Sequence, residues 1–157
     1  MSIFNKSFSY YIENFLGSST FVVVFVFLYS QTECFFDSSL ELIKAFPTIG
    51  ITSFGFLLAV LSIILQGNGE TIQFIKSREV LYKKFIHFNK KTILLSFFAS
   101  VFAFVVGNIK IENFFHINEG NLLLYKHIVV SVFFGAFIWF VIDVLMFIRV
   151  FYLIIRR

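Results

Sequence analysis

One carboxylate stands apart in this chain, because Asp143 lies inside the apolar run WFVIDVLMFIR that ends at Arg149. An ionisable side chain in such a run is expected to face protein groups or water rather than lipid, so it is a candidate for ion selectivity or ion pairing. Arg149 lies six residues further on, about 120° away around a helix, and residues three or four apart share a face. The expected partner of Asp143 therefore belongs to another helix, another subunit or water.

Three interpretations of Asp143 remain open. It pairs with a basic residue of the 70–91 connection or the C-terminus, it faces lipid as a neutral acid, or it repeats around an axis near the inner mouth of a pore. A ring of aspartates favours cations. In the pore interpretation the selectivity face continues along the same helix through Ser131, Gly135 and Trp139.

The 70–91 connection collects most of the positive charge. At about 100° per residue its basic side chains fall in one sector or at its edges, and phenylalanines and a leucine lie opposite, which predicts an amphipathic helix. The helix either lies at anionic headgroups or offers a site for a nucleotide, an oligonucleotide or a cytoplasmic partner. The residues of this basic face are Lys76, Lys83, Lys84, His87, Lys90 and Lys91.

Catalytic and metal-binding patterns are not visible. The three histidines, His87, His116 and His127, are scattered, and no HExxH pair, paired aspartates or Ser/His/Asp constellation accompanies them. Cys34 is the single cysteine, so an intrachain disulfide is impossible; the thiol is expected to be inert, with an intersubunit bridge as the alternative. We expect no enzyme, no metal and no cofactor.

The elements that must position these residues are membrane spans. The 157 residues are 59% hydrophobic, 21% aromatic and 14% charged, far more apolar than soluble domains. Four stretches of about the length that crosses a bilayer lack Asp, Glu, Lys and Arg, namely 14–32, 45–69, 92–109 and, interrupted only by Asp143, 127–148. They predict helical spans at about 14–32, 45–66, 92–109 and 122–148. The first stretch lacks a small-residue cleavage site and is kept as a span.

The distribution of charge predicts how these spans are oriented. Lysine and arginine concentrate in the 70–91 connection and the C-terminus, whereas the other two connections are mainly acidic. Because positive loops stay inside, both termini and the 70–91 connection should be cytoplasmic. The predicted fold is an all-α membrane protein, a single domain over 1–157 whose four transmembrane helices form an up-down-up-down bundle.

Small residues at helical spacing predict where the helices approach closely. The second span carries such a face at Thr52, Gly55, Ala59 and Ser62, and the fourth at Ser131 and Gly135. The face of the third span consists of Ser96, Ala99, Ser100, Ala103 and Gly107. Each face serves packing within one protomer, a subunit interface or a pore lining. Three such faces exceed what one bundle needs, which favours self-association.

The segment ITSFGFLLAVLSIILQGNGETIQFIKSREVLYKKFI, residues 49–86, resembles small four-helix membrane proteins of prokaryotic anti-phage systems. The nearest are the Hailong-type membrane effector and the Kiwa membrane subunit, with CRISPR-associated four-helix effectors as architectural relatives. The resemblance implies a homotetrameric channel or membrane-disrupting effector in the inner membrane of a prokaryote, held or gated by a nucleotide or oligodeoxyadenylate signal.

The leading hypothesis is thus a homo-oligomeric ion channel of an abortive defence system. Its pore is lined by small-residue faces, with Asp143 setting selectivity and the basic face binding an anionic ligand or partner. The alternative is a non-conducting membrane scaffold or infection sensor that recruits a cytoplasmic defence partner. A third class, a toxin-like pore, would kill on expression without a trigger.

Overall fold

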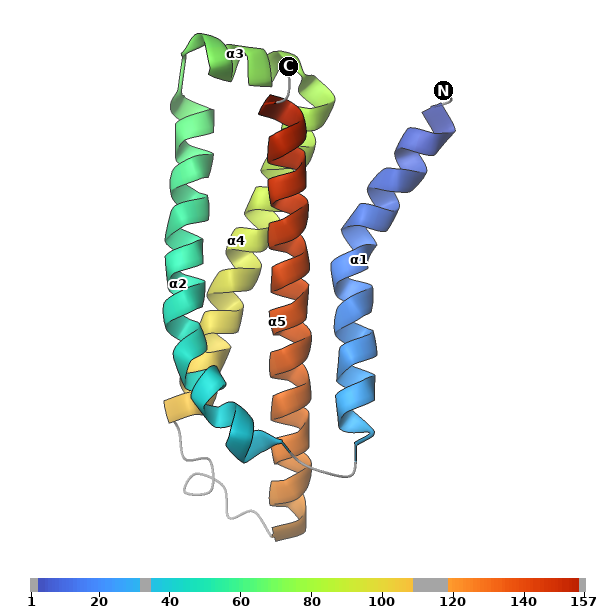
Figure 1. Cartoon of the computed structure of the whole chain (residues 1–157), viewed down its shortest axis with the longest axis vertical. Coiled ribbons are helices and arrows are strands. Elements are labelled where there is room, and N and C mark those ends of the chain that lie inside the picture. The colour runs from blue at the N-terminus through green and yellow to red at the C-terminus, as the bar shows by residue number, and fades with distance from the viewer. Residues whose placement is uncertain (1–2, 32–34, 109–118, 156–157) are drawn as a thin grey trace.

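The computed structural model describes residues 3–31, 35–108 and 119–155 (Figure 1). In these ranges the regular elements are all helices. They are α1 (Ile3–Tyr29), α2 (Phe36–Gln66), α3 (Glu70–Ser77), α4 (Glu79–Asn108) and α5 (Glu119–Ile155). The four long helices alternate in direction, and the first turn of α1, the last turn of α5 and α3 all lie at one end, which we call the α3 end (Figure 1).

The long helices pack in the order α1, α5, α4, α2, which differs from their order in the chain. α1 packs chiefly against α5, α2 packs chiefly against α4, and α4 and α5 contact each other between them (Figure 1). The consecutive helices α1 and α2 therefore flank the bundle on opposite sides. One consequence is that much of the surface of α2 is left uncovered by the protomer.

Three of these helices contain segments long and apolar enough to cross a membrane, namely Phe36–Gln66, Tyr82–Asn108 and Asn121–Tyr152. This finding supports the prediction of an all-α membrane protein. The apolar part of α1, Phe15–Tyr29, is shorter. α5 has 37 residues and is therefore about 55 Å long, as expected for a last helix that exceeds one perpendicular crossing.

Two helices begin before the spans that were predicted within them. α2 begins at Phe36 and α4 at Glu79, whereas the predicted spans begin near residues 45 and 92. Each predicted span was started after a charged residue. Charge marks the edge of the hydrocarbon, but the helical backbone continues beyond it wherever side chains reach water. Pro47 lies inside α2, where its ring removes a hydrogen bond, and the helix bends in this region (Figure 1).

The single basic helix predicted over 70–91 is instead two elements. α3 ends at Ser77, Arg78 leaves the helical region with φ −86° and ψ 65°, and the rest of the segment forms the first turns of α4. α3 lies across the end of the bundle whereas α4 runs along it (Figure 1). A change of direction this sharp requires the helix to break. As expected, the Gly67-Asn68-Gly69 segment separates α2 from the next helix.

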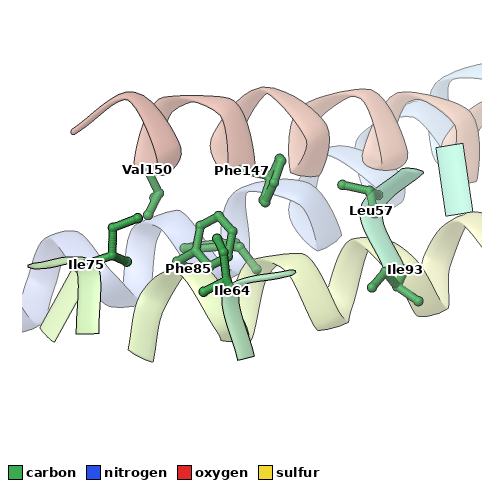
Figure 2. Close-up of a cluster of buried hydrophobic side chains, with 8 residues drawn as sticks. Leu57, Ile64, Ile75, Phe85, Ile93, Phe147 and Val150 are labelled. Carbon is green, nitrogen blue, oxygen red and sulfur yellow. The ribbon is translucent and has the colours of Figure 1, made fainter. Parts of the chain in front are cut away.

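Two clusters of buried side chains hold the bundle. The cluster at the α3 end joins α2, α3, α4 and α5, and Figure 2 shows how its side chains converge between the helices. Its members are Leu57, Ile64, Ile75, Phe85, Phe88, Ile93, Phe147 and Val150. In the second cluster Phe46 is fully buried and meets the edges of Phe133, Phe137 and Phe140 at centroid distances of 5.5, 5.7 and 6.0 Å. Such edge-to-face contacts orient aromatic rings in addition to burying them.

Gly50 explains how α2 and α4 come so close. A Cβ atom built there would collide with the Oγ atom of Ser100 and lie 3.3 Å from the carbonyl oxygen of Ser96. Both serine hydroxyls donate to carbonyl oxygens of their own helix, Ser96 to Ile93 and Ser100 to Ser96. Because these hydroxyls are satisfied locally, the contact is a close packing of small groups, as is usual between membrane helices.

Candidate functional site

A buried ion pair joins α4 and α5 inside the apolar part of the bundle. The ammonium of Lys91 donates to Oδ1 of Asp143 across 3.2 Å. The side chain of Asp143 is fully buried, whereas that of Lys91 remains 23% exposed. Asp143 therefore does find its partner on another helix, as its spacing from Arg149 predicted, and the pairing interpretation of this residue fits the structure.

Trp139 and Gly17 close the other sides of this pair. The ammonium of Lys91 lies 5.3 Å from the centroid of the Trp139 ring system, within the range of a cation–π contact. α1 approaches closely at Gly17, where a Cβ atom would collide with the Trp139 indole and lie 3.0 Å from Oδ1 of Asp143. Three helices thus enclose one carboxylate, one ammonium and one indole.

Two polar atoms of this cluster have no hydrogen-bond partner among the residues that the structure describes. They are Oδ2 of Asp143 and Nε1 of Trp139, and both are buried. A buried carboxylate with one oxygen bonded and one unpaired depends on its counter-ion, because removing the ammonium leaves an uncompensated charge. The cluster provides charge neutralisation and helix positioning.

The face of α5 that was predicted to line a pore is packed inside the protomer. Ser131 is buried and its hydroxyl donates to the carbonyl oxygen of His127. Gly135 lies against Phe21 of α1, and the Phe21 and Trp139 rings lie 5.9 Å apart. Within the protomer α1 thus packs against Gly135, Trp139 and Asp143, and Lys91 of α4 contacts Asp143. This packing favours a structural role for the face, and its assignment to a pore stays a prediction.

The predicted basic face divides into structural and outward residues. Lys76 donates to the carbonyl oxygens of Leu65 and Gly67 at 3.2 and 3.0 Å and so satisfies the end of α2. Lys91 belongs to the ion pair. Lys83, His87 and Lys90 are exposed and Lys84 is half-buried. The hydrogen bond from Lys83 to Glu79 lowers the pKa of that carboxyl below its ordinary value.

The small-residue face of α4 packs within the protomer. Ser96, Ala99, Ser100 and Ala103 are buried, and a Cβ atom at Gly107 would lie 3.0 Å from the Lys44 side chain. Packing within one protomer therefore accounts for all five residues.

The small-residue face of α2, in contrast, is not packed within the protomer. Gly55 and Ala59 are exposed, and nothing lies within 4 Å of a Cβ atom built at Gly55. We call the exposed line Thr48, Thr52, Gly55, Ala59, Ser62 and Gln66 the α2 stripe. Its members are three or four residues apart, so they follow one another along a single face. Intraprotomer packing does not explain Gly55 and Ala59.

Sequence reasoning missed Gly17, Gly50 and Asn89. Asn89 is buried and its amide donates to the carbonyl oxygen of Leu57 on α2 at 3.1 Å. Gly50 had a usable signal, because it lies on the same face of α2 as the large apolar residues Phe46 and Leu57. A small residue among large ones on a face marks a close approach.

In the ranges that the structure describes, no three His, Cys, Asp or Glu side chains come together as a metal site. No protein-family model, curated protein or solved structure matches this chain.

Proposed function

We propose that this chain is a four-span membrane channel whose copies assemble through the α2 stripe. In this proposal α1 is the fourth span. It has 27 residues, about 40 Å of helix, which exceeds the hydrocarbon thickness of about 30 Å. Both termini and the α3 end lie on the cytoplasmic side, as the concentration of lysine and arginine there predicts.

The α2 stripe is the observation that carries the proposal. It faces away from the buried side of α2, which includes Ile43, Phe46, Gly50, Leu57 and Ile64. Small and polar groups gain nothing from facing lipid tails, but they allow a helix to pack closely against another helix or to contact water. The Thr52 hydroxyl donates to the Thr48 carbonyl oxygen at 2.7 Å, so it is tolerated at a tight helix contact. Gln66 adds an amide at the end of the stripe.

An acidic residue extends the stripe at the other end. Glu41 is exposed and precedes Thr48 by seven residues, two helical turns along the same face. Repeated around an axis, Glu41 would form a carboxylate ring at the mouth of a pore, and such rings favour cations. The proposal thus moves charge selectivity from Asp143, which is enclosed in the protomer, to Glu41.

The flanks of the α2 stripe fit a contact between copies. Beside it lies a cavity of about 330 Å³ between α2 and α5. The cavity is lined by Thr52, Ser53, Phe56, Leu57, Val144, Phe147 and Ile148. Large side chains that flank the stripe in a second copy, such as Ile51 or Leu58, have room there. We propose a closed ring, with a tetramer as the expected size.

The gating signal is proposed from the α3 end and from the resemblance of residues 49–86 to anti-phage membrane effectors. Lys83, Lys84, His87 and Lys90 would bind an anionic ligand of the nucleotide type or a cytoplasmic partner and so hold or release the channel in a prokaryotic inner membrane. The second candidate is a non-conducting scaffold that recruits a defence partner. The same basic residues favour it, because they could bind such a partner whether or not the protein forms a pore.

Conductance separates the two candidates. The full-length chain is reconstituted in planar bilayers, alone and with an anionic nucleotide, and compared with the variant Ala59→Trp, which fills the stripe while leaving the packed face of α2 intact. We expect discrete single-channel currents that the variant abolishes. If neither protein conducts under either condition while both insert, the channel proposal is wrong and the scaffold stands.

A further inference from the structure

A second cavity lies between α1, the start of α2 and α5, away from the α3 end. Its volume is about 510 Å³, within the range of small-molecule sites. Its walls are apolar except for two serines. The lining residues are Val24, Phe27, Leu28, Phe35, Ser38, Ser39, Val130, Phe134 and Ile138.

The cavity has the shape and chemistry for a hydrocarbon chain. Its α5 wall consists of Val130, Phe134 and Ile138, which are four residues apart and so form a strip about 12 Å long along the helix. An ordered water needs two to four polar partners, and among the lining side chains only Ser38 and Ser39 carry a polar group. Within a membrane, an acyl chain is the abundant apolar occupant.

Two charged residues at the end of the cavity away from the α3 end indicate the headgroup of the lipid that would bind there. Lys126 precedes Val130 by one helical turn on the same strip, and Asp37 precedes the lining residue Ser38. The Lys126 ammonium lies 3.6 Å from Oδ1 of Asp37 and 5.4 Å from the centroid of the Phe36 ring. The Asp37 side chain is 85% exposed and that of Lys126 25%, so the Asp37 carboxylate can leave this loose pair for another cation, and the Lys126 ammonium is then open to an anion.

We propose that this cavity binds one acyl chain of a phospholipid with an amine-bearing zwitterionic headgroup, of the phosphatidylethanolamine type. The phosphate bonds Lys126, the ammonium bonds Asp37, and the tail follows the α5 strip towards Ile138. An anionic headgroup such as phosphatidylglycerol satisfies Lys126 but places no cation against Asp37. The inference is independent of conduction, because a scaffold of the same fold would carry the same site.

Photo-crosslinking in vesicles tests the site. Full-length protein is reconstituted in equal parts of phosphatidylethanolamine and phosphatidylglycerol, with a trace of either lipid bearing a diazirine in its tail, and the labelled peptides are mapped by mass spectrometry. The expected label from the ethanolamine probe concentrates on the lining residues of α1 and α5. Excess unlabelled phosphatidylethanolamine removes it, and excess phosphatidylglycerol does not.

Two variants separate the tail from the headgroup. Val24→Phe fills the cavity and should remove the localised label, whereas its matched control Val144→Phe, in the cavity between α2 and α5, should retain it. The double variant Asp37→Asn, Lys126→Gln should lower the preference for the ethanolamine probe about fivefold, the effect of losing roughly one headgroup-level charge contact. Thermal unfolding checks that each variant is folded.

Two results would overturn the proposal. In the first, label is spread evenly over lipid-facing residues such as Val23 and Phe98, which indicates bulk lipid only. In the second, label is localised in the cavity but equal for the two headgroups, which shows a tail groove without the proposed selectivity.

Discussion

Lys91 and Asp143, 52 positions apart in the chain, form a 3.2 Å ion pair within the apolar part of the bundle. Each lies nine residues, about 13 Å of helix, from the end of its candidate span on the α3 side. The Lys91 stem is apolar and its head is partly exposed, so it can reach towards the headgroups while neutralising the carboxylate. The pair thereby fixes α4 against α5 at the depth where a lone charge would be costly.

Removing one partner of the pair should destabilise the protein more than removing both. Lys91→Met leaves Asp143 buried and unpaired, which should lower the free energy of unfolding by about 3 kcal/mol. The double variant Lys91→Met, Asp143→Leu should recover most of this loss. Denaturant-induced unfolding in detergent micelles measures both.

The exposed pair Lys83–Glu79 supplies the control. Lys83→Met should change the unfolding free energy by less than about 1 kcal/mol, because surface ion pairs contribute little. If Lys83→Met and Lys91→Met lowered the free energy of unfolding equally, burial of Asp143 would not be what makes the loss of its partner destabilising.

Two glycines should respond oppositely to the same substitution. Gly17→Ala places a methyl group against Trp139 and Asp143 and should separate α1 from α5, lowering the unfolding free energy by roughly 1–3 kcal/mol, as overpacking does. Gly55→Ala meets open space within the protomer and should be neutral or stabilising by up to about 1 kcal/mol through helix propensity. Thermal unfolding compares the two variants. A lower unfolding temperature for Gly55→Ala than for Gly17→Ala would contradict the assignment of Gly17 as packed and Gly55 as exposed.

The basic residues of the α3 end should separate into binding and structural roles. Lys83→Glu combined with Lys84→Glu should weaken binding of an anionic nucleotide to the protein in detergent micelles by at least about tenfold, because each lost charge contact costs about 1 kcal/mol and each new carboxylate repels the anion. Lys76→Gln should instead lower thermal stability, because it exposes the carbonyl oxygens at the end of α2. Calorimetric titration and thermal unfolding measure the two effects, and a reversed pattern would refute the division.

Charge selectivity provides a test of Glu41 against Asp143. In bilayers with a salt gradient, Glu41→Gln should move the reversal potential towards that of a non-selective pore, because a ring of carboxylates would lose its charge. Asp143→Asn should leave the reversal potential unchanged in whatever protein still folds. A shift caused by Asp143→Asn alone would return the selectivity role to that residue.

Sequence patterns predicted the local features and left the pairing of faces open. Helical spacing excluded Arg149 as the partner of Asp143, but choosing Lys91 requires knowing that α4 packs beside α5. The α4 face from Ser96 to Gly107 was predicted from spacing, and it packs within the protomer. On α2 the spacing of small residues selected Gly55 and Ala59, but the close contact with α4 is made by Gly50. The helix has small residues on two opposite faces, and periodicity does not show which face packs against protein.

Gly17 was missed for a related reason. It precedes Ser18, Ser19 and Thr20, whose hydroxyls donate to carbonyl oxygens within α1. This run of small polar residues satisfies its own hydrogen bonds, so nothing in the sequence singles out the one residue that Trp139 requires to be small. The packing order of the helices could not be predicted for a similar reason, because it depends on contacts between residues far apart in the chain.

Cysteine scanning along α2 tests the central claim, self-association through the α2 stripe, most directly. With Cys34 replaced by serine, single cysteines are placed from residue 48 to 62 in membranes and oxidised, and linked dimers are quantified. A disulfide requires Cα atoms within about 7 Å, so the yield should peak at Thr52, Gly55, Ala59 and Ser62, with little from the outward residue Phe98 on α4. A flat profile, or a yield that is highest at Phe98, would contradict the claim.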